Sequence, residues 1–207
     1  MKHALLIGLS YKNTSHVLEG PIRDLYRIRD TLVDYEVTLI TDALGSKENI
    51  VECFLALVQK KGTLFFYFSG HGQETPEAIL CNDGTITQTE FRDMLRHLDP
   101  DANLVAVIDT CFSGNLFDLT YRWANEWIQQ GPPAGHVSLI SSSLENEPSL
   151  EYLTRNNAYG AFTRAYLHAI QDHPTWRELM AHIASHLAQT PLLTSADPVN
   201  IDQPFET

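Results

Sequence analysis

The feature that most constrains the fold of this 207-residue chain is a series of short apolar runs separated by longer segments with helical spacing. The runs are continuous rather than alternating, as expected for strands buried on both faces of a parallel sheet. They predict strands at residues 4–9, 35–40, 63–68, 103–108, 137–140 and 191–194. We therefore expect a three-layer α/β fold with a mostly parallel six-stranded sheet and helices on both faces.

Helix signals stand between these runs. Pro21 occupies a first helical position, and two capping boxes begin at Thr87 and Thr175, each with Glu three residues later. They predict helices from 21 to about 32, 46–59, 87–98, 158–171 and 175–187. Trp123 and Trp127 have helical spacing, which we interpret as an amphipathic stretch that packs or covers a site.

Composition narrows the classes of function. The formal net charge of −12 excludes a general nucleic-acid binder and argues against docking on an anionic membrane. The three cysteines are widely spaced and form no CxxC motif, which favours a reducing compartment. The apolar runs are too short for a signal sequence or a membrane span. We expect a cytoplasmic protein.

Reactive side chains follow the carboxyl ends of two predicted strands. His71 lies between two glycines after one strand, Asp109 and Cys111 follow the next, and Asp24 lies at the start of the first helix. Parallel strands bring such ends to one edge of the sheet. An imidazole beside a thiol converts it to the reactive thiolate, and the N–H groups of Gly72 and Cys111 could stabilise an oxyanion.

Each feature also has a structural interpretation. A cysteine at a strand end is usually a small buried apolar residue, and a Gly-His-Gly sequence is usually a turn. Their joint occurrence on successive buried strands favours a Cys–His dyad over either interpretation. His182 and His186 are four residues apart but lack the Glu of a zinc-peptidase motif, so we interpret them as a solvated helix face.

The motifs FFYFSGHG at 65–72 and VIDTCFSG at 107–114 resemble those of caspase-like cysteine peptidases of the metacaspase and orthocaspase type, in peptidase family C14 of clan CD. The segments ALLIGLSY, LISSS, YGAFT and QTPLLTS extend the resemblance over nearly the whole chain. It implies the caspase-hemoglobinase fold as a single domain over 1–207. Residues 1–130 would match the large subunit and 136–207 the small subunit, with a Gly/Pro linker at 131–135.

The resemblance also implies a function. His71 would be the general base and Cys111 the nucleophile, which cleaves a peptide bond through an acyl-enzyme. Asp24, Asp109 and Ser69 match positions that bind Arg or Lys at P1, the substrate residue before the cleaved bond. Two carboxylates beside a nucleophile suit a guanidinium or ammonium group on elementary grounds too.

Ser141, at the end of the small-subunit strand, is a further expected substrate-binding residue, and Arg122 a candidate self-cleavage site. Asp118 matches a calcium-binding position of the family, but the expected acidic pair falls on Gln88 and Thr89. We therefore expect no required cofactor and leave calcium as an open alternative.

The expected partners are protein or peptide substrates with a basic P1 residue, with neither nucleic acid nor membrane among them. We expect a monomer, with a regulatory partner as an option. Two other functions stay open. One is a caspase-like pseudo-enzyme that acts as a binding module, and the other is a clan CD peptidase, such as a legumain-like one, with a different P1 preference.

Overall fold

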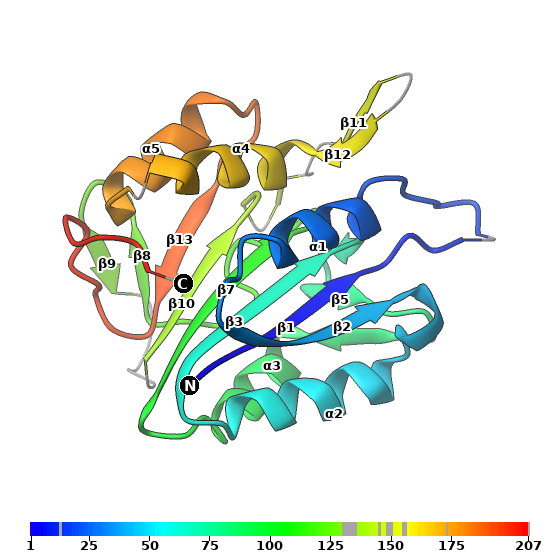
Figure 1. Cartoon of the computed structure of the whole chain (residues 1–207), viewed down its shortest axis with the longest axis horizontal. Helices are drawn as coiled ribbons and strands as arrows, with labels where there is room; N and C mark the ends of the chain where they lie inside the picture. Colours follow the sequence, from blue (N-terminus) through cyan, green and yellow to red (C-terminus); the bar gives the residue numbers. More distant parts are fainter. Residues whose placement is uncertain are drawn as a thin grey trace.

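The fold follows from apolar strands that are buried between two layers of helices. In the computed structural model, α1 (Pro21–Arg29), α4 (Ala161–Ala169) and α5 (Trp176–Ser185) cover one face of a central sheet, and α2 (Lys47–Val58) and α3 (Gln88–Leu95) cover the other (Figure 1). The structure describes residues 1–12, 14–129, 136–144, 146–147, 151–154, 157–172 and 174–206. The predicted α/β class is confirmed, and the linker predicted at 131–135 lies outside the described residues.

Among the residues that the structure describes, the central sheet has eight strands rather than the expected six. Their order is β2 (Tyr35–Thr41), β1 (Lys2–Gly8), β3 (Gly62–Ser69), β7 (Ala102–Asp109), β10 (Val137–Ser141), β13 (Leu192–Ser195), β8 (Tyr121–Trp123) and β9 (Trp127–Gln129). The first five are parallel, and each of the last three is antiparallel to the strand before it. The six predicted strands form the first part of this order. Strand β13, at the run predicted for 191–194, is therefore internal to the sheet.

The two added strands correct the interpretation of the tryptophan segment. Trp123 and Trp127 face each other across the β8–β9 hairpin, with ring centroids 5.5 Å apart. A cross-strand pair joined by a tight hairpin has the same sequence spacing as one helical turn, so spacing alone could not separate the two. Asn125 makes the turn with a left-handed φ of 67°.

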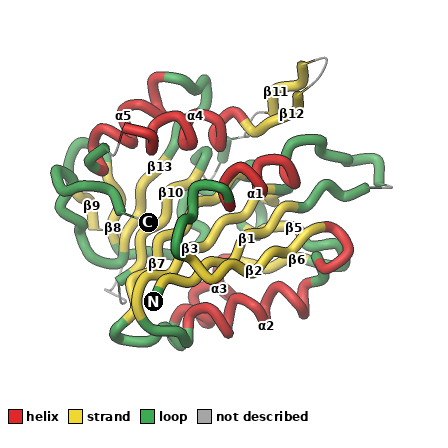
Figure 2. The backbone as a smooth tube through the Cα atoms, in the orientation of Figure 1, coloured by secondary structure: helices red, strands yellow, loops and turns green. Residues whose placement is uncertain are grey.

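Local signals set the helix starts. Both capping boxes are present, with Thr87 and Thr175 each accepting from the N–H three residues later. Helix α4 begins later than expected, because β12 (Asn157–Gly160) forms a hairpin with β11 (Glu151–Thr154). This hairpin projects from the body of the molecule (Figure 2).

Smaller elements complete the chain. A three-stranded sheet of β4 (Gly72–Gln73), β5 (Ala78–Leu80) and β6 (Thr85–Thr87) follows β3. Short 3-10 helices lie at Asp42–Leu44 and Ile170–Asp172. In the described part of the chain, no helix is both long and apolar enough to cross a membrane.

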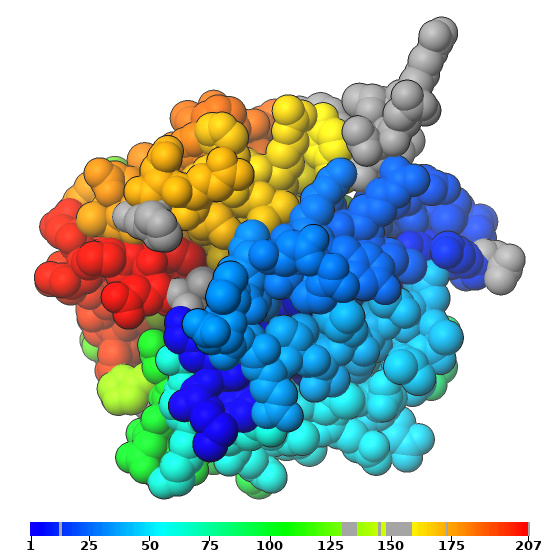
Figure 3. All heavy atoms as spheres, viewed as in Figure 1, coloured from blue at the N-terminus to red at the C-terminus, as the bar shows by residue number. Residues whose placement is uncertain are grey.

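Two apolar cores lie on opposite faces of the sheet and hold its strands in register. Beneath α2 and α3, Phe54, Phe66, Phe91 and Phe117 pack edge-to-face or tilted, with centroids 5.0–6.2 Å apart. The other core joins α1, α4 and α5 to the strands. At the surface above this second core, α1 and the start of α4 lie side by side (Figures 1 and 3). The two cores give the carboxyl ends of the strands a rigid base.

Candidate active site

The segments that carry His71 and Cys111 meet at the carboxyl ends of β3 and β7. These strands are parallel neighbours with Ser69 opposite Asp109, and the Gly70 N–H donates to the Asp109 carbonyl at 3.3 Å. A side chain at Gly72 would overlap the Cys111 carbonyl oxygen, so the two loops touch through their backbones. The predicted edge of the sheet therefore brings together the loops that carry the candidate base and nucleophile.

Backbone groups and a phenol orient His71. Its Nε2 lies 2.6 Å from the His16 carbonyl oxygen. Because a carbonyl only accepts, Nε2 carries the proton, and Nδ1 is the basic nitrogen of the neutral ring. The His71 N–H donates to the Tyr11 hydroxyl at 2.9 Å, which donates to Leu80 O at 2.8 Å. Burial raises the pKa of Tyr11 well above its usual range, so the phenol keeps its proton.

A strained turn presents Cys111. Phe112, the next residue, has a left-handed φ of 57°, and its N–H donates to Glu147 O at 3.0 Å. A non-glycine residue in this region costs on the order of 1–3 kcal/mol and persists where its surroundings enforce it. The turn reverses the chain directly after the cysteine and leaves the Cys111 side chain partly exposed.

The two candidate substrate-binding carboxylates lie together beneath the start of α4. Asp24 and Asp109 are only 1% and 6% exposed. The Gly160 N–H donates to Asp24 at 2.6 Å, and a side chain at Gly160 would overlap an Asp109 carboxylate oxygen. The N–H and hydroxyl of Thr163 donate to that same oxygen at 3.1 and 2.7 Å. The N-terminus of α4 thus contacts both acidic groups, and the Gly160 N–H lowers the pKa of Asp24 in opposition to burial.

Burial and mutual repulsion make Asp24 an unusual carboxyl group. The pKa of Asp24 is raised from 3.8 to about 7, chiefly by burial and also by the nearby Asp109. The Gly160 N–H and the Arg27 guanidinium, 2.9 Å from Asp24, oppose these effects. Asp24 therefore changes its charge near neutral pH, in a region that the sequence predicts to bind cations.

The remaining predicted pocket residues differ in their surroundings. Ser69 is buried at the end of β3, two residues after Tyr67, whose hydroxyl bonds Thr163 at 2.8 Å. Ser141 is fully buried, and its hydroxyl donates to Gly114 O at 3.1 Å and Leu192 O at 3.4 Å. These contacts join the nucleophile loop to β10 and β13, which gives Ser141 a structural task that the sequence did not indicate.

The acidic residue considered for calcium already has a cationic partner. Asp118 lies 2.9 Å from Arg92. Among the described residues, no group of three His, Cys, Asp or Glu side chains is placed to hold a metal ion. Arg122, the candidate self-cleavage residue, lies in β8 opposite Thr194 of β13, so cleavage there requires β8 to leave the sheet.

The face at the end of α5 where His182 and His186 lie makes ring contacts that the sequence does not predict. The two rings stack with centroids 4.3 Å apart, and His168 of α4 places its Nδ1 3.0 Å from His182 Nε2. Burial, followed by the neighbouring rings, lowers the pKa of His182. The sequence could not show that α4 adds a third ring to this face.

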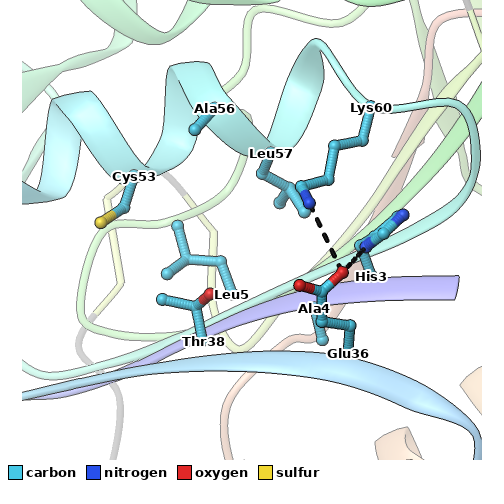
Figure 4. Close-up of a pocket in the computed structure, with 9 residues that line it drawn as sticks. All are labelled: His3, Ala4, Leu5, Glu36, Thr38, Cys53, Ala56, Leu57 and Lys60. Carbon is cyan, nitrogen blue, oxygen red and sulfur yellow. Dashed lines mark hydrogen bonds and ion pairs between the residues drawn. The ribbon is translucent and has the colours of Figure 1, made fainter.

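The other cysteines lie in unreactive surroundings. Cys53 lines a small cavity of about 90 Å³ between α2 and the first two strands, beside an ion pair in which Lys60 approaches Glu36 (Figure 4). Burial raises the pKa of the Cys53 thiol, and burial also raises that of Cys81 to about 12. Both thiols are therefore protonated at neutral pH.

Comparison with known proteins identifies sequence relatives of this chain. The family model for the caspase domain matches residues 1–200. Metacaspase-6 of Arabidopsis thaliana is 31% identical over 173 residues, covering 70% of this chain and 47% of the relative. Metacaspase-1 of Plasmodium falciparum is 28% identical over 255 aligned positions, covering 99% and 42%. The chain thus spans less than half the length of each relative.

A solved structure extends the agreement to the fold. Protein GSU0716 from Geobacter sulfurreducens superposes with a TM-score of 0.78 at 17% identity, over 98% of this chain and 97% of that one. The match to the family model includes both loops of the candidate site and the strands that hold them. Because the family model for the caspase domain matches residues 1–200, the chain belongs to the caspase-domain family.

Proposed function

We propose that this protein is a cysteine endopeptidase that cleaves peptide bonds after Arg or Lys. The observation that carries the proposal is the convergence of four residues on one edge of the sheet, where the His71 and Cys111 loops meet beside a buried pair, Asp24 and Asp109. Membership of the caspase-domain family, with metacaspases among its similar proteins, supports the same reaction class.

The proposed reaction begins at the thiol. His71 Nδ1 takes the Cys111 proton, and the thiolate attacks the carbonyl carbon on the carboxyl side of P1. The carbonyl π electrons move to oxygen, and the N–H groups of Cys111 and Gly72 are the proposed donors to this oxyanion. His71 then protonates the leaving amine as the C–N bond breaks. Water attacks the resulting thioester, which releases the acid and restores the thiol.

Asp24 and Asp109 would bind the basic P1 side chain. A guanidinium offers two parallel N–H groups to carboxylates, and an ammonium offers a compact charge. An acidic P1 residue would meet two carboxylates in a site of low dielectric, which is strongly unfavourable. The pocket therefore favours Arg and Lys and rejects Asp.

Cleavage of a set of fluorogenic peptides that differ only at P1 tests this specificity. We expect turnover with Arg and Lys. With Asp at P1, kcat/KM should be lower than with Arg by roughly 10²-fold or more, because a like charge facing a buried carboxylate costs several kcal/mol. Each peptide is measured with calcium and with a chelator, and calcium-independent turnover is expected. Preferred cleavage after Asp or Asn would contradict the P1 assignment and favour a different clan CD specificity.

The second candidate function is a pseudo-enzyme that binds a partner through this surface. The specific observation behind it is that Asp24 and Asp109 already accept hydrogen bonds from α4, and Asp24 also from Arg27. A substrate must therefore compete for part of the pocket. If an Arg-based covalent inhibitor never labels Cys111 of the folded protein, the binding module is favoured over the peptidase.

A further inference from the structure

We propose that Ser113, Ser142 and Ser143 are positioning residues that fix the direction of the Cys111 N–H for oxyanion binding. This inference rests on the proposed peptidase function. It adds a set of residues to the site that neither the sequence motifs nor the dyad geometry assign.

The observation is a convergence of three hydroxyl groups on one backbone carbonyl. The hydroxyls of Ser142, Ser113 and Ser143 lie 2.8, 3.0 and 3.2 Å from the Thr110 carbonyl oxygen. A carbonyl only accepts hydrogen bonds, so each hydroxyl is the donor. All three serines are at most 1% exposed, so water does not compete for these contacts. We call this group the serine clamp.

The clamped carbonyl belongs to the peptide unit that also contains the Cys111 N–H. The unit is planar, and in the trans form its C=O and N–H point in opposite directions. Fixing the Thr110 carbonyl therefore fixes the Cys111 N–H, which points away from the three serines. An oxyanion donor stabilises a transition state best when it is held in place beforehand, because reorientation would cost energy during the reaction.

The clamp also joins separate parts of the chain at this one atom. Ser113 comes from the nucleophile loop, whereas Ser142 and Ser143 directly follow β10, which ends at Ser141. The Ser142 N–H donates to Ile108 O at 3.0 Å, so the end of β10 is itself tied to β7. The oxyanion donor is thus supported from the segment that matches the small subunit, although the nucleophile belongs to the other region.

The test compares the double variant Ser142→Ala/Ser143→Ala with the matched control Ser138→Ala. Ser138 is a buried serine of β10, the strand that Ser142 and Ser143 directly follow, and its hydroxyl bonds Ser195 at 3.1 Å. In the double variant we expect kcat for an Arg-terminated amide to fall by about 10–100-fold with little change in KM, because the N–H donor is loosened rather than removed. The control variant should match wild type in both constants.

A pair of reagents separates oxyanion binding from thiol reactivity. An Arg-terminated peptide aldehyde adds the Cys111 sulfur to its carbonyl carbon, and its oxygen takes the proton that left the thiol. Its inhibition constant should rise by about 10–100-fold in the double variant. Iodoacetamide alkylates the same sulfur and expels iodide without forming an oxyanion, so its rate should be unchanged. An unchanged aldehyde constant, or an equal loss with both reagents, would overturn the proposal.

Hydrogen exchange tests the clamp independently of the substrate. The double variant should lose amide protection in the peptide covering residues 107–116, while Ser138→Ala should not. If wild type binds no Arg aldehyde, the proposed function fails. In that case, loss of protection at 107–116 still supports the clamp, and unchanged protection overturns it.

Discussion

Replacement of Cys111 by alanine is expected to lower kcat/KM for an Arg-terminated peptide by roughly 10⁴-fold or more, because removing the nucleophile of a covalent mechanism eliminates the acyl-enzyme route. The side chain is small and partly exposed at the end of β7, so the free energy of unfolding should change little. Steady-state kinetics and thermal unfolding of the same preparation check both expectations.

Cys53→Ala is the matched control for this variant. Cys53 lies on α2, beside the cavity of Figure 4, and burial raises the pKa of its thiol. The Cys53→Ala variant should retain wild-type turnover, and mass spectrometry should find an Arg-directed covalent inhibitor on Cys111 alone. Full activity of Cys111→Ala would show that another group performs the chemistry.

Replacement of Asp24 by asparagine is expected to make the protein less active and more stable. Asparagine keeps the shape and an acceptor oxygen for the Gly160 N–H but loses the charge that would bind P1. Loss of one partner of a buried charge pair costs about 2–5 kcal/mol, so kcat/KM for Arg peptides should fall roughly 10²-fold or more. Asp30 is exposed and lies just after α1, so the control variant Asp30→Asn should leave kcat/KM unchanged.

The stability of the Asp24 variant should depend on pH. The pKa of Asp24 is about 7 in the folded chain and 3.8 ordinarily, so its ionisation opposes folding. This penalty is absent below about pH 4, grows between pH 4 and 7, and is complete above pH 7, where it amounts to at most about 4 kcal/mol. Asp24→Asn should therefore match wild type at pH 4 and unfold at higher denaturant at pH 8. Equal midpoints at pH 8 would contradict the buried charge.

The sequence predicted the parts of the site that are carried by side chains at strand ends. Continuous apolar runs located β3 and β7, and parallel packing then placed the His71 loop beside the Cys111 loop. The number of strands was wrong because Trp123 and Trp127 have a spacing that fits both a helix and a hairpin. Only the pairing of β8 with β13 distinguishes these alternatives, and that pairing is a long-range contact.

Other parts of the site cannot be recognised from the local sequence. The His16 carbonyl that orients His71 is a backbone group, and every residue has one. The sequence identified the segment containing Ser142 only through its resemblance to the small-subunit strand of the family, because serine is common at strand ends and turns. That its hydroxyl reaches Thr110 depends on the packing of β10 against β7.

The contact between Gly72 and the Cys111 carbonyl has a consequence for protein engineering. The two loops touch backbone to backbone, without room for a side chain at residue 72. Grafting only the histidine and cysteine onto another parallel sheet would therefore not reproduce their separation. A transplant would have to carry both loops together with the buried side chains that anchor them. Tyr11 is one of these, because its hydroxyl accepts a hydrogen bond from the His71 N–H. The transferable unit is a pair of backbone paths rather than a pair of residues.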